Sequence, residues 1–124
     1  LTLHGAIYDD EKFWATLADN DVLLMPSLAE KQGKVQLEAM SAGVVPICSD
    51  SGGIPLTVEN YYNGLLFEER SATELGRRIE QIYANPDVYR ELQANGLETT
   101  SEMSLEREMD QVESIIRTHF RLEQ

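Results

Sequence analysis

The sequence predicts an α/β domain in which helices flank a parallel sheet. Short apolar runs that suit buried strands alternate with longer segments that have helical periodicity. The runs at 22–25 and 44–48 are each followed by a polar loop or turn, which is typical of buried parallel strands. Because parallel strands are joined by right-handed crossovers, this alternation indicates a Rossmann-like sheet.

Length and composition predict one ordinary globular domain. The chain has 124 residues, of which 42% are hydrophobic and 26% charged. It begins without Met inside a predicted strand, which suggests that residues 1–124 form one partial domain of a longer protein. We expect no transmembrane helix, because no run approaches about 18 apolar residues.

The net charge and the single cysteine indicate which classes of binding partner and which cellular compartment fit this sequence. The formal net charge of -12 disfavours binding to nucleic acid or to an anionic membrane surface, since both require clustered Lys and Arg. Cys48 has no intramolecular partner and lies in an apolar run, so it suits a reduced protein and a buried position. We therefore predict a cytoplasmic protein, with any membrane contact made by a part outside this chain.

The predicted strands are short. They lie at Leu1–His4, Val22–Met25, Val44–Cys48 and Gly64–Phe67. Pro46 weakens the third assignment, because proline cannot donate a hydrogen bond to a neighbouring strand.

The predicted helices are identified by caps and apolar faces. Asp9 or Asp10 caps a first helix with Phe13, Trp14 and Leu17 on its apolar face, and a second helix covers 34–42 before Gly43. A capping box at 71–74 starts a third helix, whose apolar face comprises Leu75, Ile79, Ile82 and Tyr83.

Two more helices are expected near the C-terminus. One runs from Pro86 to about Asn95 and is stopped by Gly96. Ser104 caps the last, at about 104–122, and its apolar stripe comprises Leu105, Met109, Val112, Ile116 and Phe120. This stripe either packs on the domain's own sheet or is partly exposed.

Two glutamates separated by seven residues follow the second predicted strand. Glu30 lies in the polar loop from Ser27 to Gln32, and Glu38 lies in the helix. In such a sheet, ligands bind at the carboxyl ends of the strands, where the turns after Met25 and Cys48 are expected.

The stretch from Pro26 to Phe67 resembles the retaining glycosyltransferases of family 4, also called group 1, which have the two-domain GT-B fold. Pro26-Ser27 precedes the glutamate pair, and Glu38-Ala39-Met40 surrounds its second member. Gly52-Gly53 and the segment Asn63–Phe67 follow in the family's order. The resemblance covers nearly the whole chain and implies the C-terminal, donor-binding half of such an enzyme.

The resemblance implies that the ligand is a nucleotide diphosphate sugar. Glu38 would bind the ribose, and Glu30 would act as the catalytic residue on the transferred hexose. Gly33 is expected at a helix start, where free backbone N–H groups and the helix dipole attract phosphate. The rise from Gly33 to Glu38 is about 7.5 Å, which suits a carboxylate beside the diphosphate.

The remaining donor-binding candidates are Lys31, Gln32, Lys34 and Val35. Each lysine either supports the diphosphate or only offsets nearby acids, and Glu38 could instead form a helical ion pair with Lys34. Gln32 stands where the family commonly has an aromatic residue or proline, and Lys31 replaces a frequent glycine. The loop around the transferred hexose is therefore expected to differ.

No metal or cofactor is predicted. His4 and His119 lie far apart in the sequence and lack the spacing of metal ligands. The resemblance implies metal-independent transfer, with a basic residue pair from a stretch before Leu1 and an acceptor-binding N-terminal domain that this chain lacks. The last helix would bridge to that domain, and the isolated chain would be inactive. Cell-envelope polysaccharide synthesis is the expected pathway.

Other classes fit the fold alone. A sugar-nucleotide epimerase and a non-catalytic GT-B-like binding domain share it, and the glutamate pair favours a transferase over both. A phosphoacceptor receiver domain would need a lysine after its last strand, and no lysine follows Lys34.

Overall fold

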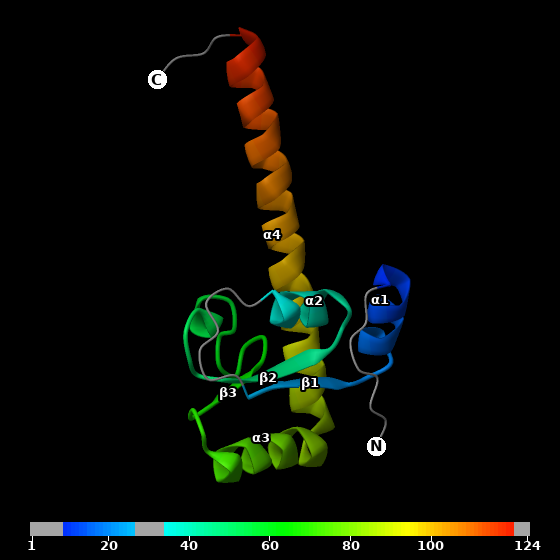
Figure 1. Ribbon diagram of the computed structural model, residues 1–124, viewed down its shortest axis with the longest axis vertical. Helices are drawn as coiled ribbons and strands as arrows, with labels where there is room; N and C mark the ends of the chain where they lie inside the picture. The colour runs from blue at the N-terminus through cyan, green and yellow to red at the C-terminus, as the bar shows by residue number, and fades with distance from the viewer. Residues whose placement is uncertain (1–8, 27–33, 121–124) are drawn as a thin grey trace.

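The computed structural model describes the backbone of residues 9–26 and 34–120, and the side chains of these residues up to Met103 (Figure 1). The predicted strand at Leu1–His4 and the predicted loop from Ser27 to Gln32 lie outside these ranges. The described elements are the helices α1 Asp10–Ala18, α2 Val35–Ser41, α3 Ala72–Ala84 and α4 Pro86–Phe120, the short 3-10 helix η1 Ile54–Leu56, and the strands β1 Val22–Met25, β2 Val45–Ser49 and β3 Leu65–Phe67.

The three described strands form a parallel sheet in the order β1-β2-β3, as predicted. Met25 pairs with Cys48, and Ser49 pairs with Phe67. This register aligns the carboxyl ends of all three strands at one edge of the sheet.

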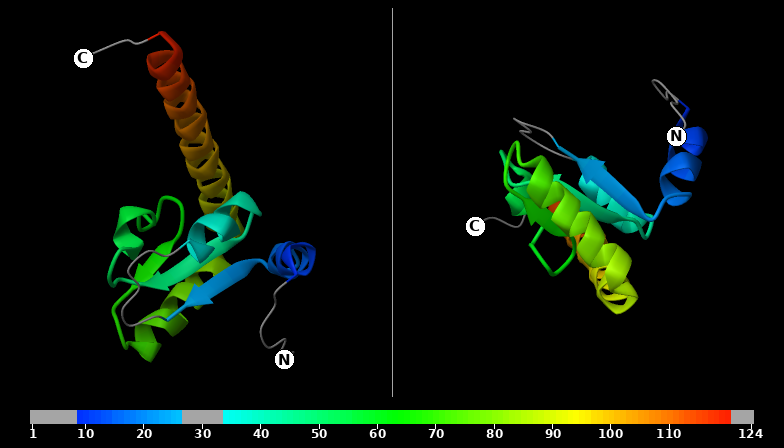
Figure 2. Two further views of the ribbon diagram at one scale, coloured as in Figure 1. Left: turned by 45° about the horizontal axis from the view of Figure 1, so that its top comes forward. Right: turned by 90° about the horizontal axis from the view of Figure 1, so that it is seen from below.

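Helices cover both faces of this sheet. Figures 1 and 2 place α2 over one face and α3 over the other, while α4 crosses beside the sheet from the α3 side to the α2 side. The chain thus has the layered arrangement of a Rossmann-like domain, and the predicted fold class is confirmed.

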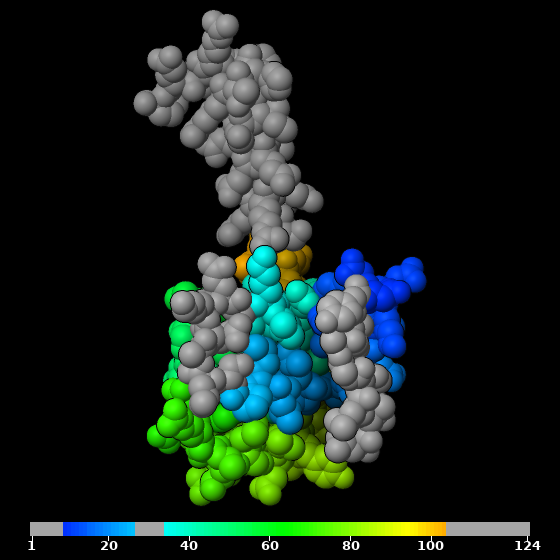
Figure 3. Space-filling model, in the orientation of Figure 1, coloured from blue at the N-terminus to red at the C-terminus, as the bar shows by residue number. Residues whose placement is uncertain are grey.

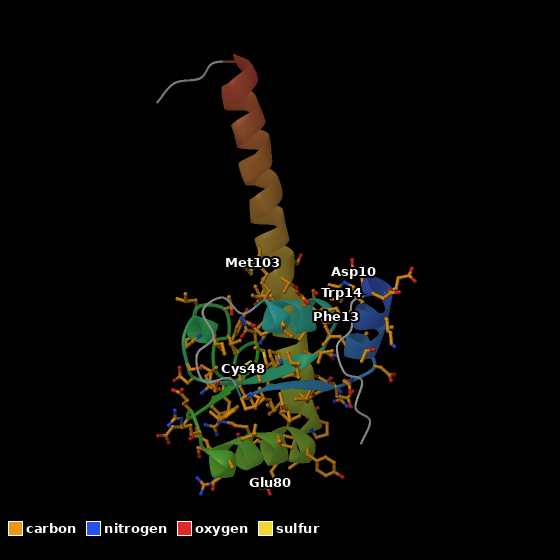
Figure 4. The ribbon with its side chains drawn as sticks, in the orientation of Figure 1. Asp10, Phe13, Trp14, Cys48, Glu80 and Met103 are labelled. Carbon is orange, nitrogen blue, oxygen red and sulfur yellow. The ribbon has the colours of Figure 1, made fainter. Side chains whose placement is uncertain are left out.

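The central strand β2 supplies alternate side chains to two cores. Val45 and Ile47 pack in a cluster with Ile82 of α3 and Leu92 of α4. Cys48 faces the other way, into a cluster under α2 that includes Met25, Met40, Ile54 and Val58, and Figure 4 shows it within the sheet. The period of two along a strand produces this division.

Two predicted helix starts are confirmed in atomic detail. Asp9 caps α1, because its carboxylate accepts from the backbone N of Lys12 at 3.2 Å. Ser71 caps α3, because its hydroxyl oxygen accepts from the backbone N of Glu74 at 3.1 Å.

The predicted apolar faces are narrower in the structure. On α1, Leu17 is buried and Trp14 is half-exposed, in edge-on contact with Phe13. On α3, Ile82 is buried, while Tyr83 is 90% exposed. Successive helical residues point about 100° apart, so Tyr83 lies at the margin of the face on which Ile82 is buried.

Two separate helices after Pro86 were predicted, and this prediction is wrong. The backbone is one helix from Pro86 to Phe120, and it passes through both Gly96 and Ser104. Gly96 is buried against Met40, and a Cβ there would lie 3.2 Å from Met40 Cγ. This glycine therefore allows α4 to pack closely on α2, instead of ending a helix.

β1 is less buried than its all-apolar sequence predicts. Leu24 is 46% exposed, while Met25 is buried. Within the described residues β1 pairs only with β2, and Figure 3 shows it at the surface between α2 and α3. Strands of parallel sheets are normally covered on both faces, so this edge is unusually open.

Candidate functional site

The candidate site lies at the edge of the sheet where the strands end. The segment after β1 leads into α2, and the segment after β2 leads through Gly52 and Gly53 into η1. Since β1 and β2 are adjacent and in register, both segments emerge at the same edge.

α2 begins slightly later than predicted. Its first helical residue is Val35, preceded by Lys34 as N-cap without a side-chain capping bond. Lys34 and Val35 are both exposed. Glu30, Lys31, Gln32 and Gly33 lie outside the described residues, so their predicted roles stay predictions.

Glu38 lies in the first turn of α2 and is half-buried. Its backbone N donates to the carbonyl of Lys34 at 2.9 Å. Among the described residues no cation pairs with the Glu38 carboxylate, so the alternative of an ion pair with Lys34 is not found.

The turn after β2 is built from small residues. Ser49 and Ser51 are buried, and their hydroxyl oxygens lie 3.2 Å apart. Gly52 has a φ of 55°, in the left-handed region that favours glycine. The backbone N of Ile54, two residues after Gly52, closes the turn by donating to the carbonyl of Ser51 at 3.2 Å. The predicted Gly52-Gly53 turn is confirmed in the structure.

A polar hollow of about 600 Å³ opens beside the ends of β2 and β3. Its walls include Asp50, Glu68, Glu69 and Asn60, together with Arg78 of α3. The side chain of Asn60 is structural, because its oxygen accepts from the backbone N of Leu66 at 2.9 Å.

Arg78 is a residue that the sequence reasoning missed. Its Nε donates to the carbonyl of Leu66 at 2.9 Å, and it pairs with Glu74 at 3.0 Å. Its guanidinium also lies 5.4 Å from the ring centre of Tyr61. The spacing of Glu74 and Arg78, four positions apart on a helix, was a signal for the ion pair but not for the contact with β3.

A second hollow, of about 440 Å³, is mainly apolar and lies between α3 and the opposite edge of the sheet. It lies along the open edge at β1, with Val22 and Leu24 on one wall and Ile79 and Tyr83 of α3 on the other. It also reaches Tyr89, whose hydroxyl donates to the carbonyl of Asp21 at 3.1 Å. Its described walls contain neither Lys34, Val35 nor Glu38.

Neither a metal site nor a membrane span is found in the part of the chain that the structure describes. Within these ranges, no three His, Cys, Asp or Glu side chains are grouped as metal ligands. None of the described helices is both long and apolar enough to cross a membrane.

The fold and the motif at its edge define the class of protein as a Rossmann-like domain of a glycosyltransferase. The sequence profile described as "Glycosyl transferases group 1" matches residues 1–99. The chain belongs to this family, and a receiver domain is therefore excluded.

Curated relatives carry the name glycogen synthase. The protein from Pelodictyon phaeoclathratiforme is 34% identical over 88 residues, which cover 68% of this chain and 18% of the relative. The protein from Thermodesulfovibrio yellowstonii is 38% identical over 88 residues, with the same shares of 68% and 18%. The chain thus spans only a small part of these relatives.

Solved structures agree on the fold. Sucrose-phosphate synthase from Thermosynechococcus elongatus matches with a TM-score of 0.78 and 30% identity, over 94% of this chain and 30% of that one. The C-terminal domain of a glycosyl transferase group 1 family protein from Francisella tularensis matches with a TM-score of 0.72 and 21% identity, over 79% and 50%. Anabaena HepE in complex with UDP-glucose matches with a TM-score of 0.70 and 22% identity, over 80% and 29%. The chain has the fold of the C-terminal half of a GT-B glycosyltransferase.

Proposed function

We propose that this chain binds the nucleotide-sugar donor of a family 4 glycosyltransferase that transfers a hexosyl group to an acceptor with retention of configuration. The observation that carries the proposal is Glu38. Its half-buried carboxylate lies in the first turn of α2, at the ligand edge of the sheet, and has no cationic partner among the described residues. Support also comes from HepE, whose structures contain UDP and UDP-glucose.

In this proposal Glu38 accepts hydrogen bonds from the ribose hydroxyls. Backbone N–H groups around Gly33, Lys34 and Val35 face the diphosphate, because the first N–H groups of a helix have no partner within it. Glu30 acts on the transferred hexose, and Lys31 and Gln32 complete the loop around it. The Ser49–Gly53 turn forms the neighbouring wall.

The proposed transfer needs no metal and no cofactor. The leaving diphosphate assists attack on the same face of the sugar, which retains the anomeric configuration. Its developing charge requires donors or cations fixed in position. In our proposal a basic pair from a preceding stretch of the full-length protein supplies these cations, and α2 supplies backbone N–H groups.

We further propose that residues 1–124 are part of a larger domain in a two-domain cytoplasmic enzyme. The open edge supports this: β1 has the apolar sequence of a covered strand, yet Leu24 is 46% exposed beside an apolar hollow. The relatives are much longer than this chain, which covers 18% of them. The rest would complete the sheet and supply the acceptor-binding domain and any membrane contact, with α4 bridging to it over about residues 104–122.

Titration calorimetry of the full-length protein with UDP, GDP and ADP tests the donor site. We expect one of the diphosphates to bind. Glu38→Ala should weaken that binding by about 10-fold to 100-fold, because hydrogen bonds to a charged group contribute about 1.5–3 kcal/mol.

Glu80→Ala is the matched control. Glu80 is an exposed glutamate of α3, on the opposite face of the sheet from α2 (Figure 4). The Glu80→Ala substitution removes the same charge from a helix remote from the site, so the affinity for the nucleotide should be unchanged. Equal affinities for the wild type and Glu38→Ala would contradict the proposed site.

A further inference from the structure

A chain of partly buried hydrogen bonds connects the first turn of α2 to α4. It starts at Gln36, which follows Val35 directly and is completely buried. Its Nε2 donates to the hydroxyl of Thr57 at 3.0 Å. Thr57 lies just after η1, so this bond joins the start of α2 to the segment that follows the Gly52-Gly53 turn.

The chain continues from Thr57 through Asn63. The Thr57 hydroxyl donates to the carbonyl of Ile54 at 3.2 Å. The backbone carbonyl of Thr57 accepts from Asn63 Nδ2 at 3.1 Å. Asn63 is 3% exposed, and its Oδ1 accepts from the backbone N of Glu59 at 2.8 Å.

The chain ends on α4. Asn63 Nδ2 also donates to the hydroxyl of Thr99 at 3.2 Å, and that hydroxyl donates to the carbonyl of Asn95 at 2.8 Å. Each hydroxyl thus accepts one bond and donates another, so the donor directions are consistent from α2 to α4. A connected network of this kind holds its members in one arrangement.

The network joins the first turn of α2 and the segment after the Gly52-Gly53 turn to the same support on α4. Gln36 fixes the turn of α2 that holds Glu38, and Thr57 fixes η1, which follows the glycine turn. Packing adds to this, because Ile54 and Val58 lie in one cluster with Met40 of α2.

We propose that Gln36 is a positioning residue that sets the first turn of α2 for nucleotide binding through Thr57 and Asn63. This inference rests on the proposed donor-binding function. Gln36 does not contact the ligand in this proposal. It keeps Glu38 and the α2 N–H groups in the orientation that the nucleotide diphosphate requires, as supporting residues of a preorganised site do.

The chain contains a matched control at the other end of α2. Gln93 of α4 donates from Nε2 to the carbonyl of Gly43 at 2.8 Å. Both glutamines therefore anchor the α2 region through an amide hydrogen bond, but only Gln36 does so at the ligand end.

The test compares Gln36→Met with Gln93→Met in the full-length protein. For each we would measure the free energy of unfolding in urea and the Kd for whichever of UDP, GDP or ADP the wild type binds. Methionine keeps the length of the side chain and removes the amide. We expect both variants to lose stability, and Gln36→Met alone to raise Kd by about tenfold, which corresponds to about 1.4 kcal/mol.

Thr57→Val gives a second measurement of the same contact. It removes the hydroxyl with little change of shape, so it should raise Kd as Gln36→Met does, and the double variant should bind no worse than either single one. If Gln36→Met does not fold, Thr57→Val alone provides the comparison with Gln93→Met.

The outcomes separate the two proposals. If the wild type binds the nucleotide and Glu38→Ala loses it, but the Gln36 and Thr57 variants bind as tightly as Gln93→Met, the positioning role is overturned and the donor site stands. If the wild type binds none of the three diphosphates, the proposed function fails and the positioning role fails with it.

Discussion

At the scale of single residues, Cys48 shows how burial determines chemistry. Its side chain is inaccessible in the cluster under α2, and burial raises the pKa of the Cys48 thiol from 9.0 to about 12. A thiol that stays protonated is a poor nucleophile, so Cys48 contributes packing and no covalent chemistry.

This pKa predicts a loss of stability in alkaline solution. The unfolded chain releases the thiol proton near pH 9 and the folded chain near pH 12. The protonated thiol therefore contributes fully to the free energy of unfolding below pH 9, and this contribution is lost as the pH rises from 9 to 12. Cys48→Ala should make the decrease in unfolding free energy from pH 7 to pH 10.5 smaller by up to about 2 kcal/mol.

Urea unfolding of both proteins at the two pH values would measure this difference. The pKa of Tyr89 is also raised, by burial and by Asp21, but Tyr89 is present in both proteins and its effect cancels. The same decrease in wild type and variant would show that Cys48 ionises freely in the folded chain.

The proposed positioning role of Gln36 could not be predicted from the sequence. Gln36 lies between Val35 and Glu38, and the sequence motif in this helix indicates only the glutamate. A polar residue that is completely buried is recognisable only from the contacts made after folding, here with Thr57, which lies 21 positions away.

At the scale of the elements, the strands and caps followed from local sequence, and the exceptions have specific physical causes. Pro46 is tolerated in the central strand because the preceding residue, Val45, donates to Asp21 on the β1 side. Backbone N–H directions alternate along a strand, so Pro46 would have donated toward β3. There, the residue next to it is Gly64, outside the regular strand.

Gly64, which lies beside Pro46, should not tolerate a larger residue, because the backbone of β2 is too close. A Cβ at this position would lie 2.7 Å from the carbonyl oxygen of Pro46 and 3.0 Å from Val58. We expect Gly64→Ala to lower the free energy of unfolding by about 2 kcal/mol or more, because backbone must move to admit the methyl group.

Gly76→Ala is the contrasting substitution. Gly76 lies inside α3 with nothing within 4 Å of an added Cβ, so alanine should stabilise the protein by about 1 kcal/mol through helix propensity. Urea unfolding of both variants measures the opposite signs. Destabilisation of equal size by both alanines would contradict the close contact between β2 and β3.

The C-terminal helices show where local signals failed. Gly96 and Ser104 are good stop and start signals in the sequence, yet α4 continues through both. Tertiary packing of Gly96 on Met40 outweighs the weak helix preference of glycine. A contact between residues 56 positions apart in the sequence cannot be inferred from a local pattern.

The candidate site was predictable to a similar extent. The sequence predicted a glycine turn after the strand that ends near Cys48, and the structure has this turn directly after β2. The roles of Glu30, Lys31, Gln32 and Gly33 remain predictions, since they lie outside the described residues. The contact of Arg78 with β3 could not be predicted, because it depends on how α3 packs on the sheet.

At the scale of the whole molecule, the open edge at β1 predicts that this chain needs its surroundings for catalysis. We expect full-length protein to transfer sugar from the nucleotide sugar that it binds, and the isolated chain of residues 1–124 to show no transfer. Product formation from a radiolabelled donor, with circular dichroism to verify that the isolated chain is folded, would measure this. Turnover by the isolated chain would contradict the two-domain proposal.

The uninterrupted α4 also has a mechanical consequence. From Gly96, where it touches α2, to Phe120 the helix extends for about 36 Å, and its outer part extends away from the sheet (Figure 1). A rigid rod of that length is a lever arm: a tilt of about 10° at Gly96 displaces its tip by about 6 Å. Small changes in the tilt of α4 beneath the proposed nucleotide site are therefore magnified at the far end of this helix.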